Sequence, residues 1–291
     1  MVSYMKRTSN ANLIDRLRIV GSITLFLIVL LVASTKSRAG IIGHWTFEAG
    51  SLVDSSGNFG DVVLEGNASI VNGELIVSKD PNSSQSPSGW ARTNGAYTGP
   101  MITSKTLVSW VTLTALSNGD DFGAAISIDS LSFDNFDAIV FAEREANRWL
   151  AGSSNFFRTQ DFNPGFEETN FGTRVQMAYT YDVIGADVTI TGYRDGIQIG
   201  QYTTPNAANW TVNDTEILFG PRHVTSGNPI GSLDARIDEA RIYNTVLSQF
   251  EIAGLTPVTA VPEPSSAVVA IAGLVSLAIR RHLRLTRTVR T

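Results

Sequence analysis

Short apolar–polar segments alternate with turns rich in Gly, Asn, Asp and Ser between residues 40 and 256. The clearest alternation lies in residues 174–182, whose apolar face carries Val175, Met177, Tyr179 and Tyr181. A period of two is typical of a strand that buries one face in a core. We therefore predict a β-strand here.

A hairpin is predicted directly after this strand. Two strand-like runs, residues 188–194 and 197–202, are separated only by Asp195 and Gly196. A type I′ turn needs positive φ at both central positions, and Asp-Gly favours that conformation. Further strands are predicted at residues 106–113, 138–143, 216–219 and 236–243.

Few other elements are indicated. Ser248 and Glu251 have the spacing of a capping box, which predicts a short helix through residue 255. Residues 81–89 are predicted as a polar loop. Many short strands without a long helical period predict an all-β fold, an antiparallel two-sheet jelly-roll sandwich. Residues 40–256 are long enough for one such domain.

Composition and charge narrow the functional classes. The 291 residues are 43% hydrophobic, and there is no Cys, which excludes disulfides, thiolate metal sites and a Cys nucleophile. Residues 40–264 carry 11 basic and 26 acidic side chains, a formal charge of −15. An acidic body argues against nucleic acid and anionic lipid as partners. Neutral glycans and divalent cations are more compatible than these with the negative charge of residues 40–264.

The N-terminal segment, residues 1–39, is predicted to be a secretory signal peptide. A basic region precedes an apolar run at residues 19–33, and Ser37 and Ala39 occupy the small-residue positions of a cleavage site. Lys36 and Arg38 lie close to that site. An uncleaved anchor is therefore the alternative.

The C-terminal segment joins a linker, residues 257–264, to an apolar helix and basic tail, residues 265–291. Prolines at 262 and 264 stop the preceding structure. The apolar run at 267–279 is shorter than the roughly 17–25 residues of a spanning helix, but flanking residues can complete a crossing. The Arg-rich tail should stay cytoplasmic, which leaves the acidic body outside.

This order of features closely resembles the PEP-CTERM sorting signal of Gram-negative bacteria. The resemblance is carried by Pro262, Glu263, Pro264, Arg280 and Arg281. It implies processing by an exosortase, transient membrane association, and a destination at the cell surface or in the extracellular matrix. The alternative is a plain C-terminal anchor with an accidental motif.

Four segments of the body resemble laminin-G-like, concanavalin A-like jelly-roll domains of bacterial surface proteins. They are residues 43–57, 178–182, 193–200 and 235–252, in the family's order. The resemblance implies the same sandwich. Arg174 departs from the family, whose strand often begins with Trp at this place.

The same resemblance implies a structural calcium ion near the joined ends of the domain. Asp238 matches the carboxylate position, and the segment from Glu48 to Gly50 would supply carbonyl oxygens. Oxygen ligands of this kind suit Ca²⁺. The alternative is that Asp238 caps or hydrogen-bonds a neighbouring turn.

No catalytic pattern is found. Glucanases that resemble laminarinases carry Glu-x-Asp-x-Glu on one strand face, where two carboxyls flank the glycosidic bond. The nearest pair, Glu143 and Glu145, is predicted to be a solvated strand end. No serine-hydrolase elbow is present. A solvated edge or loop is also predicted for a stretch without EF-hand spacing: Asp120, Asp121, Asp129, Asp134 and Asp137.

Aromatic residues outside the clear strands are candidates for glycan binding, because ligands are recognised by apolar rings beside polar groups. These residues are Trp90, Trp149, Phe156, Phe157 and Trp210. Core packing is the alternative for all five. Trp45 and Trp110 alternate within strands and are predicted as core, while His44 and His223 are given polar strand or loop roles.

These patterns predict a non-enzymatic, exported surface or matrix protein whose jelly-roll module binds polysaccharide. The alternative is a structural spacer without a soluble ligand. A glycoside hydrolase ranks third.

Overall fold

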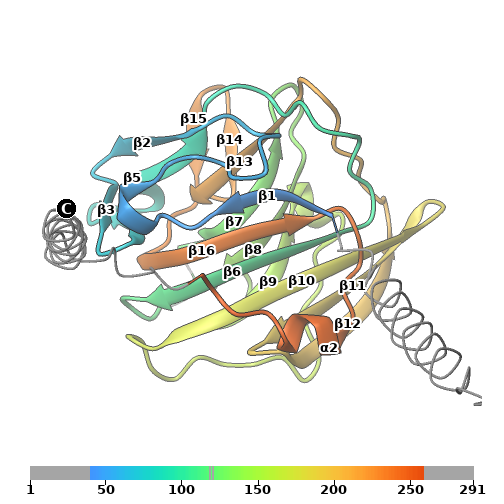
Figure 1. Ribbon diagram of the computed structural model, residues 1–291. Coiled ribbons are helices and arrows are strands. Elements are labelled where there is room, and N and C mark those ends of the chain that lie inside the picture. The colour runs from blue at the N-terminus through green and yellow to red at the C-terminus, as the bar shows by residue number, and fades with distance from the viewer. Residues whose placement is uncertain (1–39, 118, 120, 259–291) are drawn as a thin grey trace, which may run out of the picture.

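Two antiparallel sheets packed face to face make up the computed structural model (Figure 1), which describes residues 40–117, 119 and 121–258. The predicted all-β sandwich is therefore observed. The predicted signal peptide, Pro-Glu-Pro motif, C-terminal helix and basic tail lie outside the described residues. Within the described part of the chain, no helix is long and apolar enough to cross a membrane.

The first sheet has the order β12–β11–β10–β6–β16, and β1 and β4 share the free edge of β16. Its strands are β1 (Ile41–Trp45), β3 (Ser69–Val71), β4 (Glu74–Asp80), β6 (Lys105–Leu113), β10 (Arg174–Ile184), β11 (Asp187–Arg194), β12 (Ile197–Pro205) and β16 (Ala235–Tyr243). Because β1 pairs with β16, the two ends of the domain lie side by side.

The second sheet has the order β5–β13–β7–β8–β9, with β2 and β4 paired to β5. Its own strands are β2 (Val62–Gly66), β5 (Ser83–Thr93), β7 (Ala124–Ser130), β8 (Phe136–Phe141), β9 (Trp149–Ser153) and β13 (Thr215–Gly220). A separate hairpin is formed by β14 (His223–Thr225) and β15 (Asn228–Ile230). Two short 3-10 turns are η1 (Glu48–Gly50) and η2 (Ser154–Phe156).

The main core lies between the sheets and includes the apolar face that was predicted for residues 174–182. Val175, Met177, Tyr179 and Tyr181 are all buried in it. Trp45, predicted as core, is also fully buried there. The strand alternation therefore identified the buried face correctly.

A second apolar cluster covers the outer face of the first sheet. It contains Trp110, also predicted as core, together with Ile252 from helix α2 (Gln249–Ala253). The predicted capping box is present, since the Ser248 hydroxyl accepts from the Glu251 amide and the Glu251 carboxylate accepts from the Ser248 amide. Gln176 and Thr180 on the polar face of β10 are thus also buried, and Gln176 donates to the Ile252 carbonyl.

The predicted hairpin forms between β11 and β12. Asp195 has φ 49° and Gly196 has φ 74°, as the two-residue turn requires. Gly196 also touches α2, because a Cβ placed on it would lie 2.6 Å from the Ala253 Cα.

Two predicted boundaries are wrong. Residues 83–89 of the predicted loop belong to strand β5, where Pro87 faces Lys79 of β4 at a register shift. Such an irregularity tolerates a residue that lacks a backbone N–H. Strand β8 ends at Phe141 rather than at residue 143, because Ala142 adopts a left-handed conformation, φ 56°.

An ion-pair cluster joins the two sheets inside the sandwich. The Asp137 carboxylate on β8 lies 2.7 Å from Lys105 Nζ on β6 and 2.8 Å from Arg158 Nε. Burial by itself would raise the pKa of Asp137, but the two cations outweigh burial and lower it. The solvated position predicted for Asp137 is wrong, because this carboxylate is 1% exposed.

The contact between Gly196 and α2 can be tested against a matched glycine. Gly185 also has positive φ, 66°, but a Cβ there would meet nothing within 4 Å. We expect Gly185→Ala to lower the free energy of unfolding by about 1 kcal/mol, from backbone strain alone. Gly196→Ala should cost about 1–3 kcal/mol more, because α2 must shift. Urea unfolding measures both, and equal losses would show that the helix is not packed on this turn.

Candidate ligand-binding cavity

The outer face of the second sheet carries a row of side chains that the strand register aligns. Phe136 on β8 faces Asp129 on β7, and Asp129 faces Glu216 on β13. Cross-strand partners project to the same side of a sheet, so these three side chains share the outer face. Asp129 and Glu216, which are 87 positions apart in the sequence, thereby come together.

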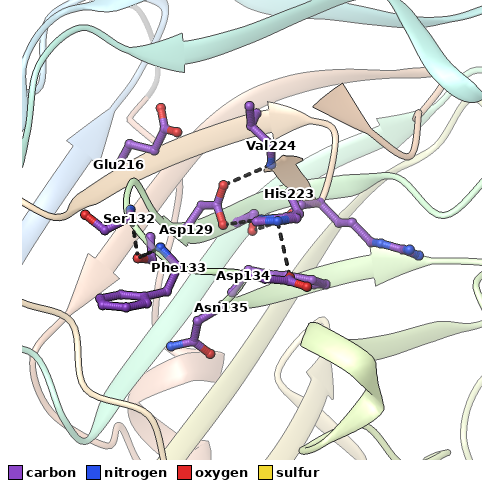
Figure 2. Close-up of polar contacts among 12 residues, drawn as sticks. Asp129, Ser132, Phe133, Asp134, Asn135, Glu216, His223 and Val224 are labelled. Atoms are coloured by element: carbon purple, nitrogen blue, oxygen red, sulfur yellow. Dashed lines mark hydrogen bonds and ion pairs between the residues drawn. The ribbon is translucent and has the colours of Figure 1, made fainter. Parts of the chain in front are cut away.

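His223 covers this row from the β14–β15 hairpin. Its Nδ1 lies 2.6 Å from Asp129 Oδ1, and the Val224 amide donates to the other oxygen of Asp129. The ring stacks on Phe136 with 5.4 Å between ring centroids. Figure 2 shows His223 between Asp129 and Asp134, whose Oδ1 lies 3.2 Å from Nε2. Burial would lower the pKa of His223, but the two carboxylates outweigh it and raise the pKa.

A cavity of about 250 Å³ opens beside this histidine. Its walls come from the β14–β15 hairpin, the loop between β7 and β8 that carries Asp134, and the η2 turn that follows β9. Glu143 and Arg222 also line it. The volume is close to the lower end of the range for small-molecule sites.

Besides His223 Nε2, which has Asp134 Oδ1 3.2 Å away, three buried polar atoms that belong to lining residues have no hydrogen-bond partner among the described residues. They are Glu143 Oε2, Ser154 Oγ and Arg222 Nε. The second oxygen of the same carboxylate is satisfied, because Arg222 Nη1 donates to Glu143 Oε1. Leaving a buried polar atom unpaired costs about 1–3 kcal/mol. A ligand hydroxyl both donates and accepts, so it suits all three atoms.

The five candidate aromatic residues separate into two groups. Trp149 and Trp210 are 2% and 1% exposed in the main core, and Trp90 is 9% exposed. The structure therefore places these three away from the surface that we predicted for them. Phe156 and Phe157 are 47% and 56% exposed, and Phe156 lines the cavity. An exposed ring beside unpaired polar atoms is the combination that sugar binding needs.

Several acids that the sequence placed in solvent are buried. Asp129 is fully buried because His223 and the hairpin cover it, and Asp121 is 9% exposed beside Lys79. Glu143 is 8% exposed, since it turns inward after the left-handed Ala142. Burial raises the pKa of Glu143, although Arg222 offsets part of that effect. By contrast, the Glu145 side chain is 47% exposed and pairs with Arg148.

The predicted calcium ligands lie elsewhere, on the first sheet. Asp238 Oδ2 is 2.6 Å from Arg174 Nη1, so a guanidinium already balances this carboxylate. Within the described residues, no group of three or more His, Cys, Asp or Glu side chains is arranged to hold a metal. Glu48 and Gly50 belong to the turn η1, in which Glu48 is half-buried and Gly50 is exposed. The donor set does not fit calcium unless Arg174 moves away, and calcium at Asp238 stays a prediction.

His223, Arg222 and Glu143 were not predicted to act together. Both histidines were predicted to have polar strand or loop roles; His223 lies on β14, and His44 on β1 contacts Glu239 Oε1 at 2.7 Å. Arg222 and His223 come shortly after the predicted strand 216–219, and Glu143 is the last residue of the predicted strand 138–143, which is a weak signal. Their meeting depends on the order β13–β7–β8, which local patterns do not specify.

Comparisons with known proteins agree with the architecture. A family model, Laminin_G_3, described as the concanavalin A-like lectin/glucanases superfamily, matches residues 71–253. Among curated proteins, the sequence search found no match.

Solved structures with the same architecture share little sequence with the chain. Domain 4 of AbnA, a GH43 extracellular arabinanase from Geobacillus stearothermophilus solved in complex with arabinotriose, is 17% identical with a TM-score of 0.52. The alignment covers 74% of this chain and 97% of that one. A structure of botulinum neurotoxin type C, described as dependent for cell entry upon interaction with two ganglioside molecules, is 16% identical with a TM-score of 0.47. That alignment covers 73% of this chain and 50% of the toxin chain.

At these identities the structural likeness concerns the fold alone. The family model is the stronger finding, because it spans more than half of the chain and includes strands of both sheets together with the residues of the cavity. The chain therefore belongs to the concanavalin A-like lectin/glucanases superfamily.

Proposed function

We propose that the chain is a non-catalytic, polysaccharide-binding module of an exported protein, which exosortase sorting delivers to the cell surface or the extracellular matrix. The observation that carries the binding role is the cavity beside His223. There, unpaired buried atoms of Glu143, Ser154 and Arg222 lie in one site with the exposed ring of Phe156. The acidic body of the chain favours an extracellular glycan over nucleic acid as its partner.

A binding role fits the acids of this site better than hydrolysis does. Glycoside hydrolysis needs two carboxyls, one to protonate the leaving oxygen and one to act as base or nucleophile. Here Glu143 is paired with Arg222, and Asp129 is paired with His223. Carboxylates held by cations in this way serve structure and ligand contact.

The binding role can be tested on a polysaccharide array that includes arabinan, since the similar AbnA domain was solved with arabinotriose. We expect the purified chain to bind at least one polysaccharide. Glu143→Gln and Phe156→Ala should each weaken that binding about tenfold, from one lost charged hydrogen bond or one lost ring contact. The control is Phe250→Ala, because Phe250 is 85% exposed on helix α2.

Two results on the array would contradict this role. No binding by the native chain would favour the structural spacer. Reducing-sugar release that Glu143→Gln abolishes would favour a glycoside hydrolase.

The calcium prediction is tested by thermal unfolding in calcium and in chelator. We expect the Tm of the native chain to be the same in both, because Arg174 already neutralises Asp238. In Arg174→Ala the carboxylate is unpaired and has Glu74 and Glu48 as charged neighbours. Calcium should then raise the Tm of the variant by several degrees. A calcium-dependent rise in the native chain would instead mean that the ion displaces Arg174.

The sorting proposal rests on the order of motif, apolar run and Arg cluster at the C-terminus. Replacing Pro262 and Pro264 with Ala should leave the protein in the membrane fraction, because the processing enzyme would no longer recognise it. Cell fractionation of the native and double-variant proteins measures this. Equal release of both would contradict exosortase sorting and support a plain anchor.

A further inference from the structure

A second cavity, of about 300 Å³, lies on the same outer face of the second sheet. It is lined by Val63 on β2, Arg92 on β5, Glu216 on β13 and Leu131 of the β7–β8 loop. Glu216 is 2% exposed, and Arg92 Nε donates to its Oε2 at 2.8 Å. Burial, only partly offset by Arg92, raises the pKa of Glu216 to about 7.

The strand register connects the two cavities. Phe136 lines the first cavity, Glu216 lines the second, and Asp129 lies between them in the cross-strand row. Neighbouring strands are about 4.8 Å apart, so the ends of this row are separated by roughly 10 Å. A ligand that occupies both cavities must therefore be longer than one sugar ring.

The β7–β8 loop, residues 131–135, runs from one cavity to the other. Leu131 lines the second cavity and Asp134 lines the first. Phe133 lies between them in the loop and is 72% exposed. Figure 2 shows Phe133 in this loop, in the same view as Asp129, Asp134 and Glu216.

Hydrogen bonds hold this loop in place. The Ser130 hydroxyl accepts from the Ser132 and Phe133 amides at 3.3 and 3.0 Å. The Asn135 amide donates to the Phe133 carbonyl, and the Ser130 amide donates to the Asn135 carbonyl. The exposed ring of Phe133 is thus carried by an ordered turn, and such a ring provides a stacking surface at a low cost in entropy.

The charges on this surface indicate which class of glycan it accepts. Each cation that lines the two cavities is already paired: Arg222 with Glu143, Arg92 with Glu216, and His223 with Asp129. An anionic uronate would meet these carboxylates without a free cation to balance it. The unpaired acceptor and donor atoms of the first cavity are instead matched by neutral hydroxyls.

We propose that the two cavities and Phe133 form one extended groove that binds a neutral polysaccharide chain across strands β8, β7 and β13, with Phe133 as the stacking surface between two subsites. This inference rests on the proposed polysaccharide-binding function and specifies its ligand class and length.

The test uses affinity electrophoresis of the purified chain in gels that contain arabinan, laminarin or alginate. We expect a neutral polymer, arabinan or laminarin, to retard the protein and alginate to have no effect.

Calorimetry with size-graded oligosaccharides of the retarding polymer then measures how the affinity depends on ligand length. Affinity should rise at least tenfold from the disaccharide to the tetrasaccharide. Phe133→Ala should remove most of that gain and leave disaccharide binding unchanged. Val63 is partly exposed and lines the second cavity, so Val63→Arg would fill that cavity and should also remove most of the gain in affinity with length. The control variant Phe250→Ala should bind every oligosaccharide as the native chain does.

The outcomes separate this groove from the binding function itself. Binding of a neutral polymer whose affinity does not depend on length, or on Phe133, would overturn the extended groove and leave a single-cavity lectin. Retardation by alginate alone would overturn the neutral ligand class. Retardation by none of the three polymers would overturn the groove, and an array without any binding would contradict the polysaccharide-binding function as well.

Discussion

The buried carboxylate of Asp137 is the constraint on which the rest of the sandwich depends. It accepts from Lys105 of the first sheet and from Arg158, which follows the last strand of the second sheet. Lys105 also lies 4.2 Å from the centroid of the Tyr181 ring in the core. Removing one member of a buried ion pair costs about 3–5 kcal/mol, because the remaining charge is left without a partner. These contacts fix the position of β8 relative to β6.

The same cluster shapes the cavity on the opposite face of the second sheet. Arg158 donates to the Phe136 carbonyl and to Asn135 Oδ1, so it holds the start of β8 and the end of the β7–β8 loop. Its amide donates to Ser153 Oγ, which holds the end of β9 just before the η2 turn. The floor and one wall of the cavity are therefore positioned from inside the core. A site built on strands held in this way is more rigid than one built on free loops.

The sequence predicted what local periodicity controls. The alternation in residues 174–182 identified a strand and its core face, Asp195 and Gly196 identified the hairpin, and Ser248 with Glu251 identified the capped helix. Each of these features depends on residues that lie within about ten positions of one another in the sequence. The family of the domain could likewise be recognised from short segments, and the match over residues 71–253 agrees with it.

The candidate site could not be predicted in the same way, because distant strands build it. Asp129, Asp137 and Glu143 are acids that usually face solvent, and they are buried here only because His223, Lys105, Arg158 and Arg222 meet them from other elements. Trp149 and Trp210 lie in weakly patterned sequence but fill the core. Phe156 was selected for its ring, while Phe133, in the same kind of segment, was missed.

Mapping where a bound glycan protects the protein from hydrogen exchange would test directly whether the cavity beside His223 binds polysaccharide. Hydrogen–deuterium exchange would be followed by mass spectrometry with and without the polysaccharide that binds most tightly. We expect slower exchange in the β7–β8 loop, the η2 turn and the β14–β15 hairpin, the three elements around the cavity. Protection confined to the first sheet or to helix α2, with these elements unchanged, would contradict this expectation.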